Sequence, residues 1–157
     1  MEPVTAEEIL SAFDEADEDI PLPDLERVDF DALDYLGWIH PSGHLGYLVL
    51  LSPNDARLKG VVMRRSSFGG TRPGFEMCSL CHHMHQPHGT AMFTMTCKDT
   101  NHRHSIGNVV CKNLDCSLRI RDMVDPAPFI KETLYVEAKI WRMQLALHKW
   151  MRAANRL

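Results

Sequence analysis

Two pairs of cysteines constrain the fold of this chain more than any other feature. Cys78 and Cys81 form a C-x2-C pair, and Cys111 and Cys116 form a C-x4-C pair after a gap of 29 residues. A structural zinc ion is held tetrahedrally by four ligands, and thiolates grouped two and two can supply all of them. Each short spacing lets one tight turn present both sulfurs to the same metal. The pattern therefore predicts one structural Zn²⁺ bound by these four cysteines.

Other uses of the cysteines fit the sequence less well. Disulfides need an oxidising compartment, but the N-terminus is acidic and has no apolar stretch typical of a secretory signal. A redox C-x2-C motif would begin a helix in a βαβ unit, whereas Gly and Pro residues precede Cys78. Reactive thiols and simple core packing stay open as alternatives. The fifth cysteine, Cys97, ends a strand-like stretch, and we expect it to pack as a small apolar residue.

Histidines crowd the region between and behind the two pairs. Imidazole is a good zinc ligand, so one histidine could replace a cysteine or several could form a second metal site. The alternative, which we favour, is a set of exposed loop side chains that titrate near neutral pH. The six residues concerned are His82, His83, His85, His88, His102 and His104.

Enzymatic activity is the weaker hypothesis. A catalytic zinc keeps an open coordination position, whereas four cysteines close the sphere. The sequence has no H-E-x-x-H, G-x-S-x-G, Walker or G-x-G-x-x-G motif. We therefore expect a non-enzymatic protein whose metal serves the fold.

Composition and charge favour one domain with an uneven charge distribution. The chain has 157 residues, of which 45% are hydrophobic, and no apolar run long enough to span a membrane. We expect no membrane association and a cytoplasmic location. Residues 1–36 carry thirteen acidic side chains and one basic one, whereas residues 57–121 carry ten basic and three acidic ones. The basic region would attract an acidic protein or an RNA backbone, unless the acidic arm neutralises it within the molecule.

Hydrophobic patterns and turn residues predict the secondary structure. A capping box at Thr5 and Glu8 predicts a helix near 5–15. A second apolar stripe, Leu134, Ala138, Trp141 and Leu145, lies beside the main stripe of the C-terminal helix, so we expect that helix to be buried over a wide arc; a docking site for a partner helix is the alternative. The predicted strands are 45–51, 58–64, 90–97 and 105–111, and the further predicted helices are 29–36, 115–121 and 131–154.

Together these elements predict an α+β fold: a small antiparallel sheet with a treble-clef four-cysteine zinc site and a long C-terminal helix. We expect residues 1–27 to form an acidic N-terminal arm with a short helix. Residues 28–157 would form the zinc-binding domain.

Four segments resemble a known family: Met77–Cys81, Asn108–Cys111, Asp115–Arg121 and the upstream Leu33–Trp38. They are similar to the FBP C-terminal treble-clef zinc-finger family, the zinc domain of FusB-type proteins that bind elongation factor G. The resemblance covers roughly residues 28–155. It implies zinc on the four cysteines, binding of elongation factor G through the zinc-domain surface, its release from the ribosome, and protection against fusidic acid.

The family pattern is not matched throughout. FusB-type proteins place a helical bundle before the zinc domain, whereas only an acidic segment of about 30 residues precedes it here. The resemblance thus favours a protein-binding module for elongation factor G or another translation factor. From their charge, Lys112, Arg119 and Arg121 are the predicted partner contacts. The alternative function is a basic zinc module that binds RNA or the ribosome directly.

Overall fold

A five-stranded antiparallel sheet forms the centre of the computed structural model, which describes the whole chain except residues 16, 18, 68–73, 99–103 and 129. The strand order is β1-β2-β3-β6-β7, and a separate two-stranded sheet pairs β4 with β5. The predicted α+β class is therefore confirmed. The strands are β1 Leu36–Ile39, β2 Leu45–Leu51, β3 Leu58–Ser67, β4 Glu76–Met77, β5 Met84–His85, β6 Thr90–Thr96 and β7 Ser105–Cys111.

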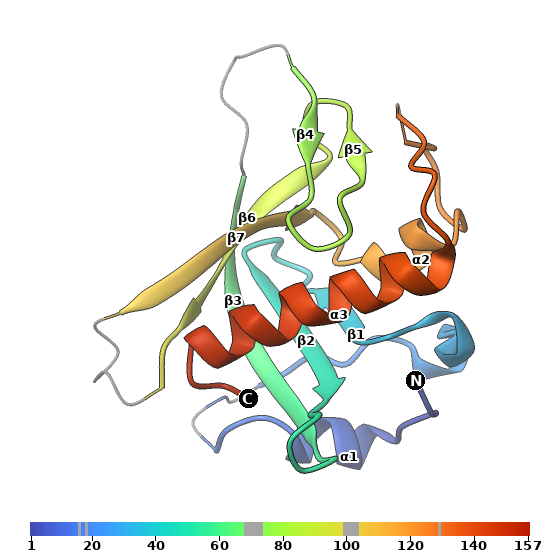
Figure 1. Cartoon of the computed structure of the whole chain (residues 1–157). Coiled ribbons are helices and arrows are strands. Elements are labelled where there is room, and N and C mark those ends of the chain that lie inside the picture. The colour runs from blue at the N-terminus through green and yellow to red at the C-terminus, as the bar shows by residue number, and fades with distance from the viewer. Residues whose placement is uncertain (16, 18, 68–73, 99–103, 129) are drawn as a thin grey trace.

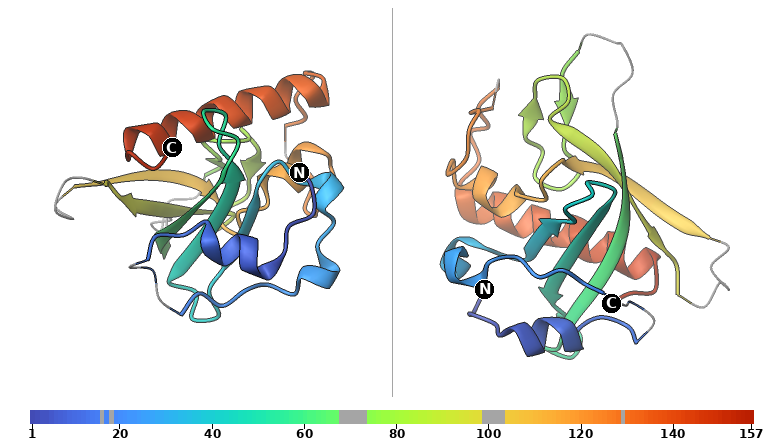
Figure 2. Two further views of the ribbon diagram at one scale, coloured as in Figure 1. Left: turned by 90° about the horizontal axis from the view of Figure 1, so that it is seen from below. Right: turned by 180° about the vertical axis from the view of Figure 1, so that it is seen from behind.

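Helices lie on both faces of the sheet. The long helix α3 (Val136–Ala153) crosses one face, and the short helix α1 (Ala6–Ser11) lies on the other (Figures 1 and 2). Helix α2 (Cys116–Ile120) follows β7 directly. Two 3₁₀ turns, Leu25–Arg27 and Phe30–Ala32, connect α1 to β1. Among the described residues, no helix is long and apolar enough to cross a membrane.

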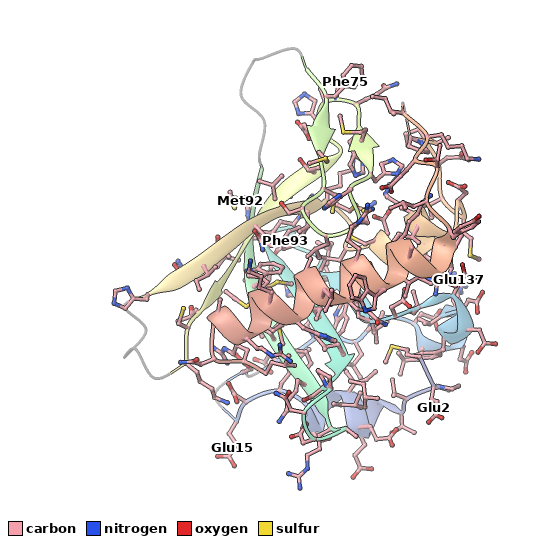
Figure 3. The ribbon with its side chains drawn as sticks, in the orientation of Figure 1. Glu2, Glu15, Phe75, Met92, Phe93 and Glu137 are labelled. Carbon is pink, nitrogen blue, oxygen red and sulfur yellow. The ribbon has the colours of Figure 1, made fainter. Side chains whose placement is uncertain are left out.

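The main core lies between the sheet and α3. Phe93 and Met95 on β6 alternate with less buried neighbours, as period-two strand geometry requires, and both belong to the core that includes α3 residues. Figure 3 shows Phe93 beside α3, whereas Met92 leaves β6 in another direction. Full burial of one large apolar side chain contributes about 1.5–3 kcal/mol. Helix α3 supplies four buried side chains of this kind, Met143, Leu147, Trp150 and Met151.

A second core lies on the opposite face, under the N-terminal arm. Ile9 of α1 packs with Trp38, Tyr47 and Val49. The Phe13 ring lies so close to Gly60 that a Cβ there would be 2.7 Å from the ring, so β3 admits only glycine at this point. The predicted capping box of α1 is confirmed, although the helix ends at Ser11 instead of near residue 15. The acidic arm thus covers one part of the sheet.

The predicted helix over 29–36 is wrong. The segment forms only the 3₁₀ turn Phe30–Ala32 and then enters strand β1. Leu36 and Trp38 are buried while Gly37 and Ile39 between and after them are half-buried. This alternation belongs to a strand, and pairing with β2 supplies the backbone partners that a single turn of helix would lack.

The C-terminal helix differs from its prediction in two ways. It begins at Val136, five residues later than expected. Its second stripe is not buried: Trp141 is 65% exposed and Leu145 is 48% exposed. The sheet covers only one side of the helix, and no described element covers the other side (Figure 1). The expected wide buried arc is therefore wrong, and an exposed apolar row takes its place.

We expect Asp14 to hold the arm in place. Its carboxylate pairs with Lys98 at 2.6 Å and with Arg156. Partial burial would raise the pKa of Asp14, but the two cations outweigh it and lower that pKa. The ionised group therefore stabilises the fold at pH 7, and the contribution is lost as the pH falls through the folded-state value.

The Asp14→Asn variant should lose about 1 kcal/mol of unfolding free energy at pH 7, a value reduced by solvent screening, as measured by urea unfolding. Asp24→Asn is the matched control, because the Asp24–Arg27 pair is exposed at 57% and 87%. Equal stability of the two variants would contradict a role for Asp14 in anchoring the arm.

Candidate metal centre

The first cysteine pair sits in a tight turn after β4. The amides of Leu80 and Cys81 point at the Cys78 sulfur, at 3.4 and 3.5 Å. His82 then closes the turn by donating its backbone N–H to the carbonyl of Cys78 at 3.0 Å, in a left-handed conformation with φ 59°. Such N–H···S contacts favour the thiolate form that a metal requires. The turn therefore orients the two sulfurs, and its amides favour the thiolate form of Cys78.

The second pair is brought in by a strand and a helix. Cys111 ends β7, and Cys116 is the first residue of α2. Between them, Leu114 adopts φ 58°, and its amide bonds the Cys111 carbonyl at 2.9 Å. This left-handed residue lets a four-residue spacer reverse the chain within the space that shorter spacers usually fill. The longer C-x4-C spacing thus still presents both sulfurs on one side.

The four sulfurs meet at one buried point. Their ligand atoms all lie within 4.8 Å of one another. Cys78 Sγ is 3.6 Å from Cys116 Sγ, and Cys81 Sγ is 3.4 Å from Cys111 Sγ. A tetrahedron with Zn–S bonds of about 2.3 Å has edges of about 3.8 Å. The donor set and its dimensions fit one zinc ion, so the predicted zinc ligands are brought together by the fold.

The ionisation of the cluster also suits a metal site. Burial would raise the pKa of the Cys78 thiol, but hydrogen bonds with the other three cysteines outweigh it and lower that pKa well below its usual range. The same contacts raise the pKa of Cys111. Burial, with the charge of the Cys116 sulfur and a hydrogen bond to it, raises the pKa of Tyr35. Four thiolates so close together repel one another, and a bound divalent cation relieves this repulsion.

His85 lies against the cluster from the two-stranded sheet. Its Nε2 is 3.2 Å from Cys111 Sγ, and the side chain is almost wholly buried. Burial, aided by the charges of His83 and Arg119, lowers the pKa of His85 to about 4. A neutral ring with its proton on Nε2 donates to the Cys111 sulfur, as outer-shell groups do around metal ligands. Gly89 makes room for this ring, since a Cβ there would be 2.4 Å from the Cβ of His85.

The three basic residues predicted as partner contacts occupy different environments. Arg119 is only 7% exposed and forms a bidentate pair with Asp115, both N–O distances being 3.0 Å. Arg121 bonds Asp34 at 2.7 and 3.2 Å. Lys112 is exposed. Arg119 and Arg121 therefore form ion pairs within the protein that stabilise the metal module. Contact with a partner stays a prediction for all three residues.

The other candidate groups do not gather around a second metal. In the described part of the chain, the four cysteines are the only group of three or more possible donors placed to share an ion. His83 is buried against His85, whereas His82, His88 and His104 are exposed; His102 lies outside the described residues. Cys97 is buried in the main core, in keeping with the expected packing role.

One supporting residue has no recognisable sequence signal. Glu76 accepts hydrogen bonds from the His88 amide and from the Thr90 amide and hydroxyl, at 3.1, 3.0 and 2.6 Å. These bonds tie β4 to the start of β6 and so fix the small sheet that carries His85. A lone glutamate after a Gly/Pro stretch gives no indication of this role in the sequence.

The comparisons with known proteins agree with this geometry. The model of the FBP C-terminal treble-clef zinc-finger family matches residues 8–153, so the chain belongs to that family. Among solved structures, the fusidic acid resistance protein FusC is similar with a TM-score of 0.61 and 15% identity, over 97% of this chain and 59% of FusC. The chain thus spans 59% of the length of FusC, and the likeness shows the shared fold. No curated protein matches the chain.

Metal removal should unfold the module around the sulfurs. Helix α2 has five residues and β4 and β5 have two each, lengths that are unstable without outside support. We expect one zinc per chain by elemental analysis, and loss of amide protection over 77–85 and 111–120 in hydrogen exchange after chelation. Cys116→Ser should reproduce this loss, whereas Cys97→Ser should retain zinc. Unchanged protection in metal-free protein would contradict a structural zinc.

The contact between His85 and Cys111 predicts a measurable effect on zinc retention. His85→Phe fills much of the same space but cannot donate to the sulfur. Zinc affinity in competition with a chromophoric chelator should fall by about tenfold or more, the usual effect of losing an outer-shell partner. His104→Phe, an exposed change, is the control. Equal zinc affinity for the two variants would show that the N–H···S contact has no role.

Proposed function

We propose that this protein is a non-enzymatic module that binds a translation factor at the ribosome, with elongation factor G as the expected partner. Family membership supports this proposal, because FusB-type proteins, whose zinc domain defines the family, bind elongation factor G. The four-thiolate site leaves no open metal position for chemistry. A cytoplasmic location follows from the proposed partner.

The exposed apolar row on and before α3 is the observation that carries a binding function. Trp141 and Leu145 are four positions apart on α3 and so lie on one side of it, and exposed Leu134 lies just before the helix. Tyr135, which is 82% exposed, and Ile130, which is 60% exposed, lie in the segment before α3. Clustered exposed apolar groups of this size mark interaction sites, and Trp and Tyr are the side chains that most often dominate binding energy.

The row is joined to the metal module by direct contacts. Arg142, on the same helix, bonds the Cys81 carbonyl at 3.2 Å and Glu132 at 2.8 Å. Helix α2, which begins with a zinc ligand, packs against α3. The zinc site therefore fixes the position of the helix that presents the row. We propose that the row is the apolar part of the partner surface, and that exposed Lys112 adds a charge contact.

The proposal is tested with purified elongation factor G and zinc-loaded protein. Trp141→Ala and Leu145→Ala should each weaken the complex about tenfold or more in calorimetry, because each removes an apolar contact from the centre of the surface. Leu10→Ala is the matched control, since Leu10 is 47% exposed on α1 at the other face of the sheet. Zinc content should be unchanged in all three.

Two outcomes would count against the proposal. The absence of a complex at micromolar concentration would remove elongation factor G as the partner. An equal loss for Leu10→Ala would remove the α3 row as its surface. Protection of translation from fusidic acid is a separate readout, measured in a reconstituted extract with and without the protein, and it need not accompany binding.

A further inference from the structure

The outer face of the sheet, opposite α3, is only partly covered. The N-terminal arm and α1 pack over β1, β2 and the start of β3. Figure 2 shows β6 and β7 extending beyond this covered part, and no described helix lies over that side of them. The residues of β6 that alternate with the buried core positions, Met92, Thr94 and Thr96, are half-buried there. This uncovered half is where a second ligand could lie.

A hollow of about 840 Å³ occupies this half of the sheet. The described residues that line it are polar apart from one leucine, and they supply hydroxyl, imidazole and guanidinium groups but no carboxylate. The arrangement contrasts with the covered half, which is apolar and aromatic. The lining residues are His44, Leu45, Arg64, Arg65, Ser66, Thr94, Thr96 and Ser105.

Arg64 gives the hollow a positive charge, because it pairs with Thr94 in the strand register and so lies on the same face of the sheet. Arg65 pairs with the core residue Phe93, so its side chain lies on the other face, where it bonds the Gly43 carbonyl at 2.9 Å and the Lys112 carbonyl at 3.2 Å. Arg64 is exposed and has no ion pair among the described residues. By contrast, Arg121 and Arg156 are each neutralised by an aspartate. The described part of the acidic arm therefore leaves Arg64 without an acidic partner.

We propose that this hollow binds the phosphodiester backbone of single-stranded RNA. Guanidinium groups and hydroxyls are the usual partners of phosphate oxygens, and serine and threonine hydroxyls can also bond the ribose 2′-hydroxyl. No Phe, Tyr or Trp is among the described residues that line the hollow, and Phe93 lies in the core beside α3 (Figure 3). The bases therefore have no large stacking platform, so the contact follows the backbone and is independent of sequence.

An acidic protein fits the hollow less well than RNA. Protein interfaces are organised around buried aromatic and aliphatic anchors, and the only apolar lining residue in the described part of the chain is Leu45. The apolar row on α3 lies on the opposite side of the sheet. The two surfaces can therefore be occupied at once, and the RNA site does not rest on the proposed translation-factor complex.

Fluorescence anisotropy of a labelled 12-nucleotide oligouridylate, titrated with zinc-loaded full-length protein, tests the site. One phosphate contact predicts a slope of about −0.7 for log affinity against log salt, or roughly a 2.6-fold loss between 50 and 200 mM salt. Arg64→Glu should weaken binding at least tenfold and flatten this slope. Thr94→Lys, which adds a cation opposite Arg64 in the strand register, should strengthen binding about threefold.

Arg57→Glu is the matched control, because it makes the same charge change at an exposed arginine in the turn before β3. It should alter the affinity less than twofold, and binding of elongation factor G should be unaffected by Arg64→Glu. The proposal is overturned if Arg57→Glu and Arg64→Glu weaken binding equally, or if no binding occurs at 50 mM salt. Equal binding of oligodeoxyuridylate, or displacement by polyglutamate of equal charge, would overturn the RNA assignment.

Discussion

The convergence of four sulfurs at one buried point holds the centre of this molecule together. Cys78 and Cys116 are 38 positions apart, yet their sulfurs are 3.6 Å apart. The segments that carry the sulfurs are too short to be stable alone: a turn between two-residue strands, and a five-residue helix. Metal binding by such sites contributes roughly 10–16 kcal/mol in small zinc modules, which is enough to order them. The four-sulfur site therefore fixes the position of α2. Through α2 it also fixes the position of α3, which packs against it.

The surroundings of the sulfurs show how a doubly negative site is accommodated away from water. Four thiolates and one Zn²⁺ carry a net charge of −2, which is costly to bury without donors. The Leu80 and Cys81 amides meet one sulfur, and His85 meets another. Arg119 lies nearby with its own partner, Asp115. The positive charge of Arg119 therefore helps to offset the negative charge of the site. This explains why Arg119, which was predicted to be a surface contact, is buried.

The sequence predicts the parts of the fold that have short-range signals. The cysteine spacing identifies the metal ligands, and the β-branched stretches identify β2, β6 and β7 to within one residue. The failures are segments whose structure depends on distant partners. The sequence around Leu36 and Trp38 is compatible with a helix or a strand, and pairing with β2 decides for the strand. Trp141 has the spacing of a core residue, but it is exposed because the sheet covers only the other side of α3. The contact of His85 with Cys111 likewise crosses 26 positions and has no local signature.

The internal ion pairs determine which charged side chains stay unpaired at the surface. Asp34 pairs with Arg121, and Asp14 pairs with both Lys98 and Arg156, so the acidic N-terminal region offsets part of the basic charge of the rest of the chain. Among the described residues, exposed Arg57, Arg64 and Lys112 have no ion pair, and of these Arg64 lies on the polar half of the outer sheet face. The apolar row lies on the other side of the sheet, on α3. Because one sheet separates Arg64 from the α3 row, a substitution at either surface should alter one kind of contact without disturbing the other. Loss of the metal should instead also affect the row, because α2 packs against α3 and Arg142 bonds the Cys81 carbonyl.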